Sequence, residues 1–380
     1  MSDDLKPSRL LSRLEAEIAG ARTQVEADCK RAERAACLAR LTRLGEARSE
    51  IIELQERNGR NPKIELSIWV NLAEGLVAYF DNVGVNTTDR VRRAHALSVA
   101  ARQMPMWALC AAWLAQLAYS ILDMDALARH VREALSIAET SNHAARSRAC
   151  LVVAQALHLA GRADLATAWY ERSRFHASID GDDLTISALM HNMAWLRMLT
   201  IRQVVLFDKR EGDPKALATA LTNAESTDGF DKMRGDQSWQ DLKPILRAQI
   251  VSLQGDAGGA VALYEQHLAS AGAPSRLQSN LLADKAWCHV QLGHEREARS
   301  CVELALASLT DETQIDDLAA SHSRLSQVFG KLHDTIRQNH HANAADEAWG
   351  THRRLQAQAI VLLEDMDDRG NARPIDRRPA

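Results

Sequence analysis

A short helical motif that ends in alanine returns about every forty residues, and this repetition constrains the fold more than any other feature. In each copy, a small or apolar residue lies four positions before the alanine. Successive steps are 42, 39, 40, 54 and 38 residues between copies that end at Ala73, Ala115, Ala154, Ala194, Ala248 and Ala286, of which the copy at Ala248 is weaker. A fixed period of roughly twenty to fifty residues is typical of proteins that stack one supersecondary unit. The sequence therefore predicts a stack of repeats.

The composition favours helices throughout the chain. Ala, Leu and Arg are the most frequent residues, and all three favour helices. Aromatic residues make up 4%, and no segment alternates as a strand would. The chain has 380 residues, more than the roughly 250–300 at which one compact core stops growing. In a solenoid each repeat contacts only its neighbours, so this length needs no large core. We therefore expect an all-α fold of stacked antiparallel helix pairs.

Charge and composition argue against several classes of partner. The net charge of −4 and the pI of about 6.4 give no basic footprint for nucleic acid. Because the N-terminus is acidic, we expect no signal peptide. No apolar run in the sequence is long enough to span a membrane. The six cysteines are dispersed, as in a reduced compartment. We expect a cytoplasmic protein with no nucleic-acid or membrane partner.

Loop and capping signals divide the chain into segments. We expect a flexible N-terminus at 1–8, a capping helical hairpin at 9–60, a repeat array at 61–366 and a disordered tail at 367–380. The longest step, with its polar and glycine-bearing sequence, predicts an inserted loop near 225–240. The predicted helix pairs are 63–80 with 88–103, 105–121 with 124–139, 143–160 with 163–178, 183–205 with 214–226, 240–254 with 257–271, 276–292 with 295–308, and 313–337 with 343–366.

Three of these pairs share a turn with the same pattern of residues. Gly161 is placed to end one helix in a left-handed cap, and Ala166 follows five residues later, where the second helix crosses the first. Gly255 with Ala260 and Gly293 with Ala298 repeat the spacing, and an aromatic residue follows in two of the three copies. The copy near Leu122 lacks the glycine.

This combination of small residue, glycine turn and alanine resembles the tetratricopeptide repeat, in the longer-period variety of bacterial regulators. The resemblance covers about 60–370 and rests on recurrence rather than on any single copy. It implies a right-handed α-solenoid, a TPR-like superhelix whose first helices line a concave groove for peptides or partner helices.

If the first helices line such a groove, residues one or two turns from each alanine face a partner. This set is polar with aromatic anchors, as expected of a peptide-binding surface. It comprises Asn71, Glu74, Gln116, Tyr119, Gln155, His158, His191, Asn192, Trp195, Gln249, Asp284 and Trp287.

Sequence motifs for chemistry are absent. The chain has no zinc-protease, nucleophile-elbow, phosphate-loop or dinucleotide-binding pattern. The spacing of Cys288, His289, His294 and Cys301 fits no standard zinc site, and His340 with His341 is expected at a loop or helix end. We therefore expect no catalytic residues, no metal and no cofactor.

These observations favour a non-enzymatic scaffold or regulator that captures a peptide or partner helix in the groove. One alternative is a sensor of a small signalling peptide or metabolite, which a closed superhelix with a deep pocket would favour. A second is a structural homo-oligomer, such as a homodimer, that associates through the amphipathic segment 8–45, with Leu11, Leu14 and Ile18 on one stripe.

Overall fold

The computed structural model describes residues 8–81, 87–234, 243–269, 275–311 and 313–367. Over these ranges the protein is all-α, with seventeen helices and no strand, which confirms the predicted fold class at that level. In chain order the helices are α1 (Arg9–Ala19), α2 (Gln24–Arg40), α3 (Leu44–Arg60), α4 (Ile64–Phe80), α5 (Thr87–Ala100), α6 (Met104–Ser120), α7 (Met124–Ile137), α8 (His143–Leu159), α9 (Ala163–Asp180), α10 (Asp183–Leu206), α11 (Pro214–Arg234), α12 (Lys243–Leu253), α13 (Ala257–His267), α14 (Ser275–Gln291), α15 (Glu295–Ala307), α16 (Ile315–Lys331) and α17 (Thr335–Leu363).

Helices pack in consecutive pairs, from α2 with α3 to α16 with α17. Even-numbered helices also contact one another, as α2 contacts α4, α6 contacts α8, and α14 contacts α16. The six alanines of the sequence repeat all lie on even-numbered helices and are fully buried. Small side chains at these positions allow neighbouring helices to approach closely. The alanine period thus marks the contacts between successive layers.

The turns within pairs repeat one backbone conformation. Gly161, Gly255 and Gly293 have φ of 77°, 87° and 77°, which confirms the predicted left-handed caps. Thr42, Leu122 and His333 adopt the same conformation without being glycine, with φ of 59°, 58° and 57°. The Schellman bond that closes such a cap recurs as well, with lengths of 2.8 Å for Arg162 N to Leu157 O and 3.0 Å for Asp123 N to Ala118 O. The backbone repeat is therefore more regular than the sequence repeat.

The N-terminal segment 9–60 forms three helices instead of the predicted hairpin. Helix α1 ends at Gly20, and the Thr23 side chain then caps α2 by accepting from Glu26 N at 3.1 Å. A second turn at Thr42 separates α2 from α3 without a glycine or proline to mark it. The apolar side of α1 is buried within the protein, including Leu11 and Leu14.

Two further boundaries differ from the prediction. Helix α11 continues to Arg234, so residues 225–234 of the predicted inserted loop are helical, and residues 235–242 lie outside the described chain. The last turn lies at residues 332–334, not at 338–342, because Asp334 caps α17 by accepting from Arg337 N at 3.0 Å. His340 and His341 therefore belong to a helix interior. The predicted flexible N-terminus and tail fall almost entirely outside the described residues.

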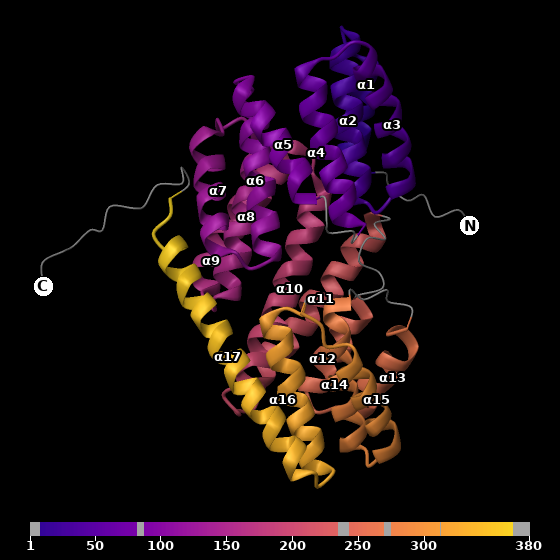
Figure 1. Ribbon diagram of the computed structural model, residues 1–380, viewed down its shortest axis with the longest axis vertical. Helices are drawn as coiled ribbons and strands as arrows, with labels where there is room; N and C mark the ends of the chain where they lie inside the picture. The colour runs from indigo at the N-terminus through magenta and orange to yellow at the C-terminus, as the bar shows by residue number, and fades with distance from the viewer. Residues whose placement is uncertain (1–7, 82–86, 235–242, 270–274, 312, 368–380) are drawn as a thin grey trace, which may run out of the picture.

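Helix α17 runs back along the molecule and reaches α7 and α8 (Figure 1). Ala359, Leu363 and Met366 are buried in the same apolar cluster as side chains of α6 to α9. Arg132 of α7 donates to the carbonyl oxygen of Leu362 at 2.7 Å, which satisfies one of the free carbonyls at the end of α17. We call this contact the seam.

A second return contact joins α1 to the turn between α9 and α10. Ser8 Oγ donates to Asp183 at 2.8 Å, and Arg13 forms an ion pair with Asp180 at 2.6 Å. Both of these return contacts involve the α7–α10 region. In the described part of the chain, no helix is long and apolar enough to cross a membrane.

Candidate binding residues on the even-numbered helices

Five of the predicted site residues immediately follow a buried alanine on consecutive even-numbered helices. This shared position gives them the same helical phase on α6, α8, α10, α12 and α14. Three are buried amides with 3–6% of their surface exposed, and two are half-buried tryptophans. We call these five side chains the ladder: Gln116, Gln155, Trp195, Gln249 and Trp287. Their burial places most of the ladder between layers rather than on an open groove.

Three predicted amides carry a side-chain oxygen without a hydrogen-bond partner among the described residues. They are Asn71 Oδ1, Gln155 Oε1 and Gln249 Oε1, and all three are sealed from solvent. The Asn71 nitrogen donates to Ser67 O at 2.7 Å, so only its oxygen is left unsatisfied. Buried polar atoms in folded proteins are nearly always paired, so each exception needs an explanation.

The predicted histidines are also inside the stack. His158 Nδ1 lies 3.3 Å from the Tyr170 hydroxyl, and burial lowers the His158 pKa to about 4. His191 stacks on Trp195 with ring centroids 6.4 Å apart. Burial, aided by the charge of Lys243, lowers the His191 pKa to about 4. Both imidazoles are therefore neutral at pH 7 and offer hydrogen bonds rather than charge.

Asp284 is engaged by its own chain. Its carboxylate accepts from the Tyr264 hydroxyl and from Arg324 Nε, both at 2.7 Å. Burial and then the charge of Asp284 raise the Tyr264 pKa well above its usual value, so the phenol stays protonated and donates. The Arg324 guanidinium also lies over the Trp287 ring at 5.5 Å. Asp284 and the neighbouring Trp287 are thus held in place by contacts within the chain.

A second ion-pair network lies nearby in the C-terminal half. Arg202 Nη2 is 3.0 Å from Asp317 and 3.5 Å from Asp316, and Asn280 donates to Asp317 at 3.0 Å. All four side chains are more than 90% buried. The buried arginines Arg202 and Arg324 thus have carboxylate partners supplied by the fold.

The remaining predicted residues lie away from the ladder or at its margin. Glu74 pairs with Arg90 of α5 at 3.0 Å and accepts from Gln55 of α3, so it points toward odd-numbered helices. Tyr119 and Asn192 are half-buried on α6 and α10. The predicted set is therefore not one continuous surface, although most of it lies on even-numbered helices.

Sequence reasoning missed a cationic cluster in the N-terminal half. The Arg148 guanidinium lies 4.1 Å from the centroid of Trp113, and Arg40 pairs with Asp182 at 2.8 Å. These arginines come from α8 and α2, which are far apart in the sequence. Nothing in the sequence distinguishes them from the many exposed arginines on other helices.

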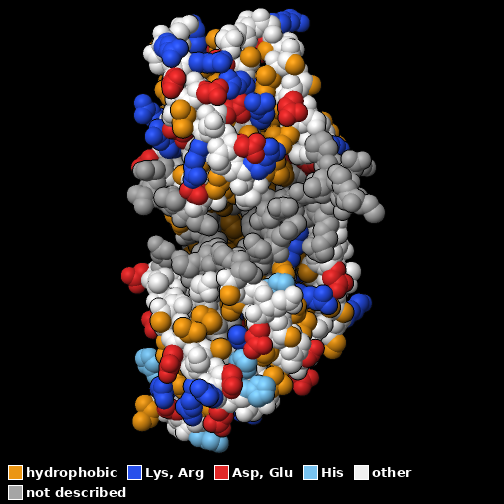
Figure 2. All heavy atoms as spheres, turned by 90° about the vertical axis from the view of Figure 1, so that its right-hand side faces the viewer, with side chains coloured by type: hydrophobic (Ala, Val, Ile, Leu, Met, Phe, Trp, Pro, Cys, Tyr) orange, Lys and Arg blue, Asp and Glu red, His pale blue; other side chains and the backbone are white. Residues whose placement is uncertain are grey.

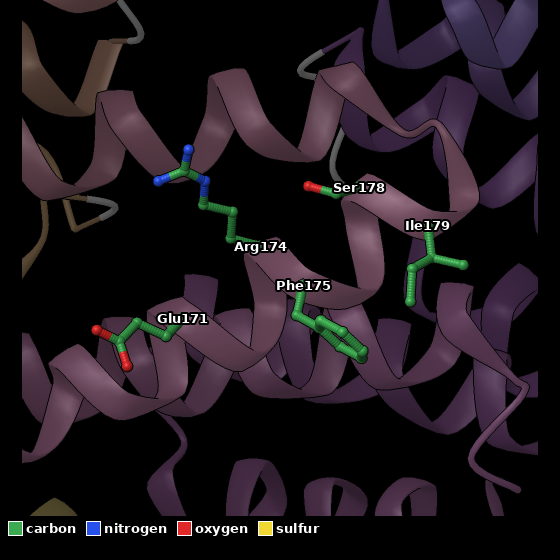
Figure 3. Close-up of a pocket in the computed structure, with 5 residues that line it drawn as sticks. All are labelled: Glu171, Arg174, Phe175, Ser178 and Ile179. Carbon is green, nitrogen blue, oxygen red and sulfur yellow. The ribbon is translucent and has the colours of Figure 1, made fainter.

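Two cavities bear on the binding of a small ligand. One, of about 420 Å³, lies against a single face of α9 (Figure 3), where Phe175 is 60% and Ile179 54% exposed. It is shallow because one helix supplies all its walls. The other, beside Arg202 and His352, measures about 10 Å³, which is room for at most one water molecule. Neither is the deep pocket that a metabolite sensor needs.

The outer surface and the comparisons add limits. On the face in Figure 2, acidic and basic side chains are intermixed over both halves. Among the described residues, no three His, Cys, Asp or Glu side chains are grouped as metal ligands.

No family model, curated protein or solved structure matches the chain. The tetratricopeptide resemblance therefore rests on the residues of this chain.

Proposed function

We propose that the chain is a non-enzymatic binding protein, a TPR-like α-solenoid that holds an extended segment of another protein along the ladder. The architecture supports this proposal through its successive helix pairs, its repeated left-handed turns and its buried alanines. Stacks of this kind present side chains of equivalent helices at regular intervals, which suits a ligand that is itself linear.

The unsatisfied amide oxygens carry the proposal. A buried polar atom without a partner costs about 1–3 kcal/mol, and leucine at the same positions would avoid that cost. Gln155 and Gln249 belong to the ladder, and Asn71 lies on another even-numbered helix. An extended segment offers backbone N–H groups that these oxygens would accept. Their presence is explained by binding better than by folding.

A partner reaches sealed oxygens only after the stack opens. The seam is the contact best placed to open, because it joins the end of the chain to α7 and α8 through few elements. In this proposal, the partner binds the open form more tightly than the closed form and so shifts the equilibrium between them. The homo-oligomer alternative is less well supported, because the apolar side of α1 is buried within one chain.

A double variant tests the proposal. Gln155→Leu with Gln249→Leu removes two unsatisfied oxygens, so the free energy of unfolding should rise while partner capture from the native host is lost. Gln266→Leu, at an exposed position of α13, is the matched control. Urea denaturation and mass spectrometry of captured proteins are the measurements. If the double variant captures the same partners as the wild type, the proposal is wrong.

A further inference from the structure

Arg148 is a buried cation that the fold leaves without a carboxylate. The residue is 8% exposed and forms no ion pair with any described residue. Its single hydrogen bond to the described part of the chain is a long one, from Nη2 to Thr185 Oγ1 at 3.5 Å. Buried charges in proteins are normally paired, so this arginine needs an explanation.

Asp182, the carboxylate whose charge acts on Arg148, already binds other groups. Asp182 pairs with Arg40 at 2.8 Å and accepts from the Thr185 backbone N–H and hydroxyl at 3.0 and 2.7 Å. Arg40 also places a like charge close to Arg148. Burial and then the repulsion from Arg40 lower the Arg148 pKa to about 9, which leaves the side chain charged at neutral pH. Asp182 is therefore engaged by Arg40 and Thr185 and forms no ion pair with Arg148.

The orientation of Arg148 leaves an edge for a ligand. The guanidinium lies over the Trp113 ring, so the ring covers one face while the N–H groups point outward in the guanidinium plane. A carboxylate binds such an edge through two parallel hydrogen bonds. Arg202 has Nε and Nη1 sealed from solvent without partners, whereas the sealed unpartnered atoms do not include those of Arg148. The edge of Arg148 is thus less enclosed.

We propose that Arg148 binds a carboxylate group of a ligand, with Trp113 positioning the guanidinium and Arg40 adding to the positive potential. The Arg148 guanidinium carries a single positive charge, so a monoanion suits the site better than a phosphate dianion.

The position of Arg148 relates this site to the ladder. Arg148 precedes Gln155 on α8 by seven residues, which is two turns or about 10 Å along one helix face. About three extended residues span that distance. The carboxylate therefore belongs to a peptide, as an acidic side chain or a C-terminus. Only this choice of source rests on the proposed function, because the Arg148 site is testable without a protein partner.

Short synthetic peptides test the site directly. The probes are N-acetyl-trialanine with a free C-terminal carboxylate, its C-terminal amide, and inorganic phosphate, each titrated by calorimetry at constant ionic strength. The variants are Arg148→Met, which keeps a side chain over Trp113, and Arg148→Lys, which keeps the charge but not the paired N–H donors of the guanidinium. Arg129→Met, at an exposed position of α7, is the matched control. Circular dichroism verifies that each variant is folded.

The expected result is that the carboxylate peptide binds at least about tenfold more tightly than the amide, which is about 1.4 kcal/mol. Arg148→Met should lose this preference, Arg148→Lys should retain part of it, and Arg129→Met should match the wild type. Equal binding of acid and amide, unchanged preference in Arg148→Met, tighter binding of phosphate, or no binding of the acid overturns the proposal. None of these outcomes depends on the Gln155 and Gln249 experiment, so the two proposals fail separately.

Discussion

The two halves of the protein treat buried charge differently. In the C-terminal half, Arg324 pairs with Asp284, and Arg202 pairs with Asp316 and Asp317. In the N-terminal half, Arg40 pairs with Asp182, but Arg148 has no carboxylate of its own among the described residues. The buried arginines Arg202 and Arg324 of one half are neutralised within the fold, whereas Arg148 of the other half is a buried cation without a described carboxylate partner.

This difference separates two uses of a polar interior. A paired network fixes the arrangement of the helices that supply it, and breaking it exposes a charge that nothing else compensates. An unpaired cation contributes little to folding, and a ligand gains by neutralising it. The same residue type therefore has opposite consequences for stability in the two halves, and substitutions should reveal the contrast.

The largest expected effect comes from Asp284→Ala. The change leaves the buried Arg324 guanidinium and the Tyr264 hydroxyl without their acceptor. Removing one partner of a buried pair costs about 3–5 kcal/mol, so the free energy of unfolding in urea should fall by that amount. Asp346→Ala, at an exposed position of α17, should change it by less than about 0.5 kcal/mol. Equal effects of the two changes would show that the buried contacts of Asp284 do not stabilise the C-terminal half.

The seam determines whether the two halves unfold together. Leu363 is 1% exposed and packs with side chains of α6 to α9, so Leu363→Ala should cost about 3 kcal/mol through lost burial and a new cavity. Leu304→Ala, at a position 54% exposed on α15, is the control. Calorimetry should show one transition in both proteins. Two separated transitions in the wild type would mean that the halves are independent and the seam adds little.

A pH series sharpens the comparison at the C-terminal network. Burial, and then the charge of Arg202, lower the His352 pKa from 6.5 to about 4. The folded state therefore favours neutral His352, and its contribution is complete above pH 6.5 and is lost as the pH falls toward 4. Between pH 7.5 and pH 5 the wild type should lose about 2 kcal/mol that His352→Gln does not lose. Parallel pH profiles for the two proteins in urea denaturation would show that His352 does not report on Arg202.

Much of the fold was predictable because helix packing requires small residues at fixed intervals. The buried alanines and the caps at Gly161, Gly255 and Gly293 were read from the sequence and are present. The turns at Thr42 and His333 were missed because the packing of flanking helices imposes a left-handed conformation on residues that do not favour it. Local propensity gives no signal for a turn that tertiary contacts enforce.

The candidate site was less predictable. The helical phase of the ladder was found, but whether Gln155 faces solvent or a neighbouring layer depends on helices that lie far away in the sequence. Asp284 shows the same limit, because its partners Tyr264 and Arg324 are 20 and 40 residues away. Arg148 was missed because an arginine on a predicted helix is usually exposed, and only the three-dimensional arrangement buries it.

The substitution with the smallest expected effect should raise the free energy of unfolding instead of lowering it. Arg148→Met removes a buried cation with no ion-pair partner among the described residues, while the methionine side chain still packs on Trp113. In buffer without carboxylates, the free energy of unfolding should rise by about 1 kcal/mol, because desolvation of the charge is no longer required. Arg324→Met should lower it, since Asp284 then loses its partner. If both substitutions destabilise the protein equally in urea, Arg148 is part of a self-sufficient network, and the interior of the N-terminal half needs no ligand to balance its charge.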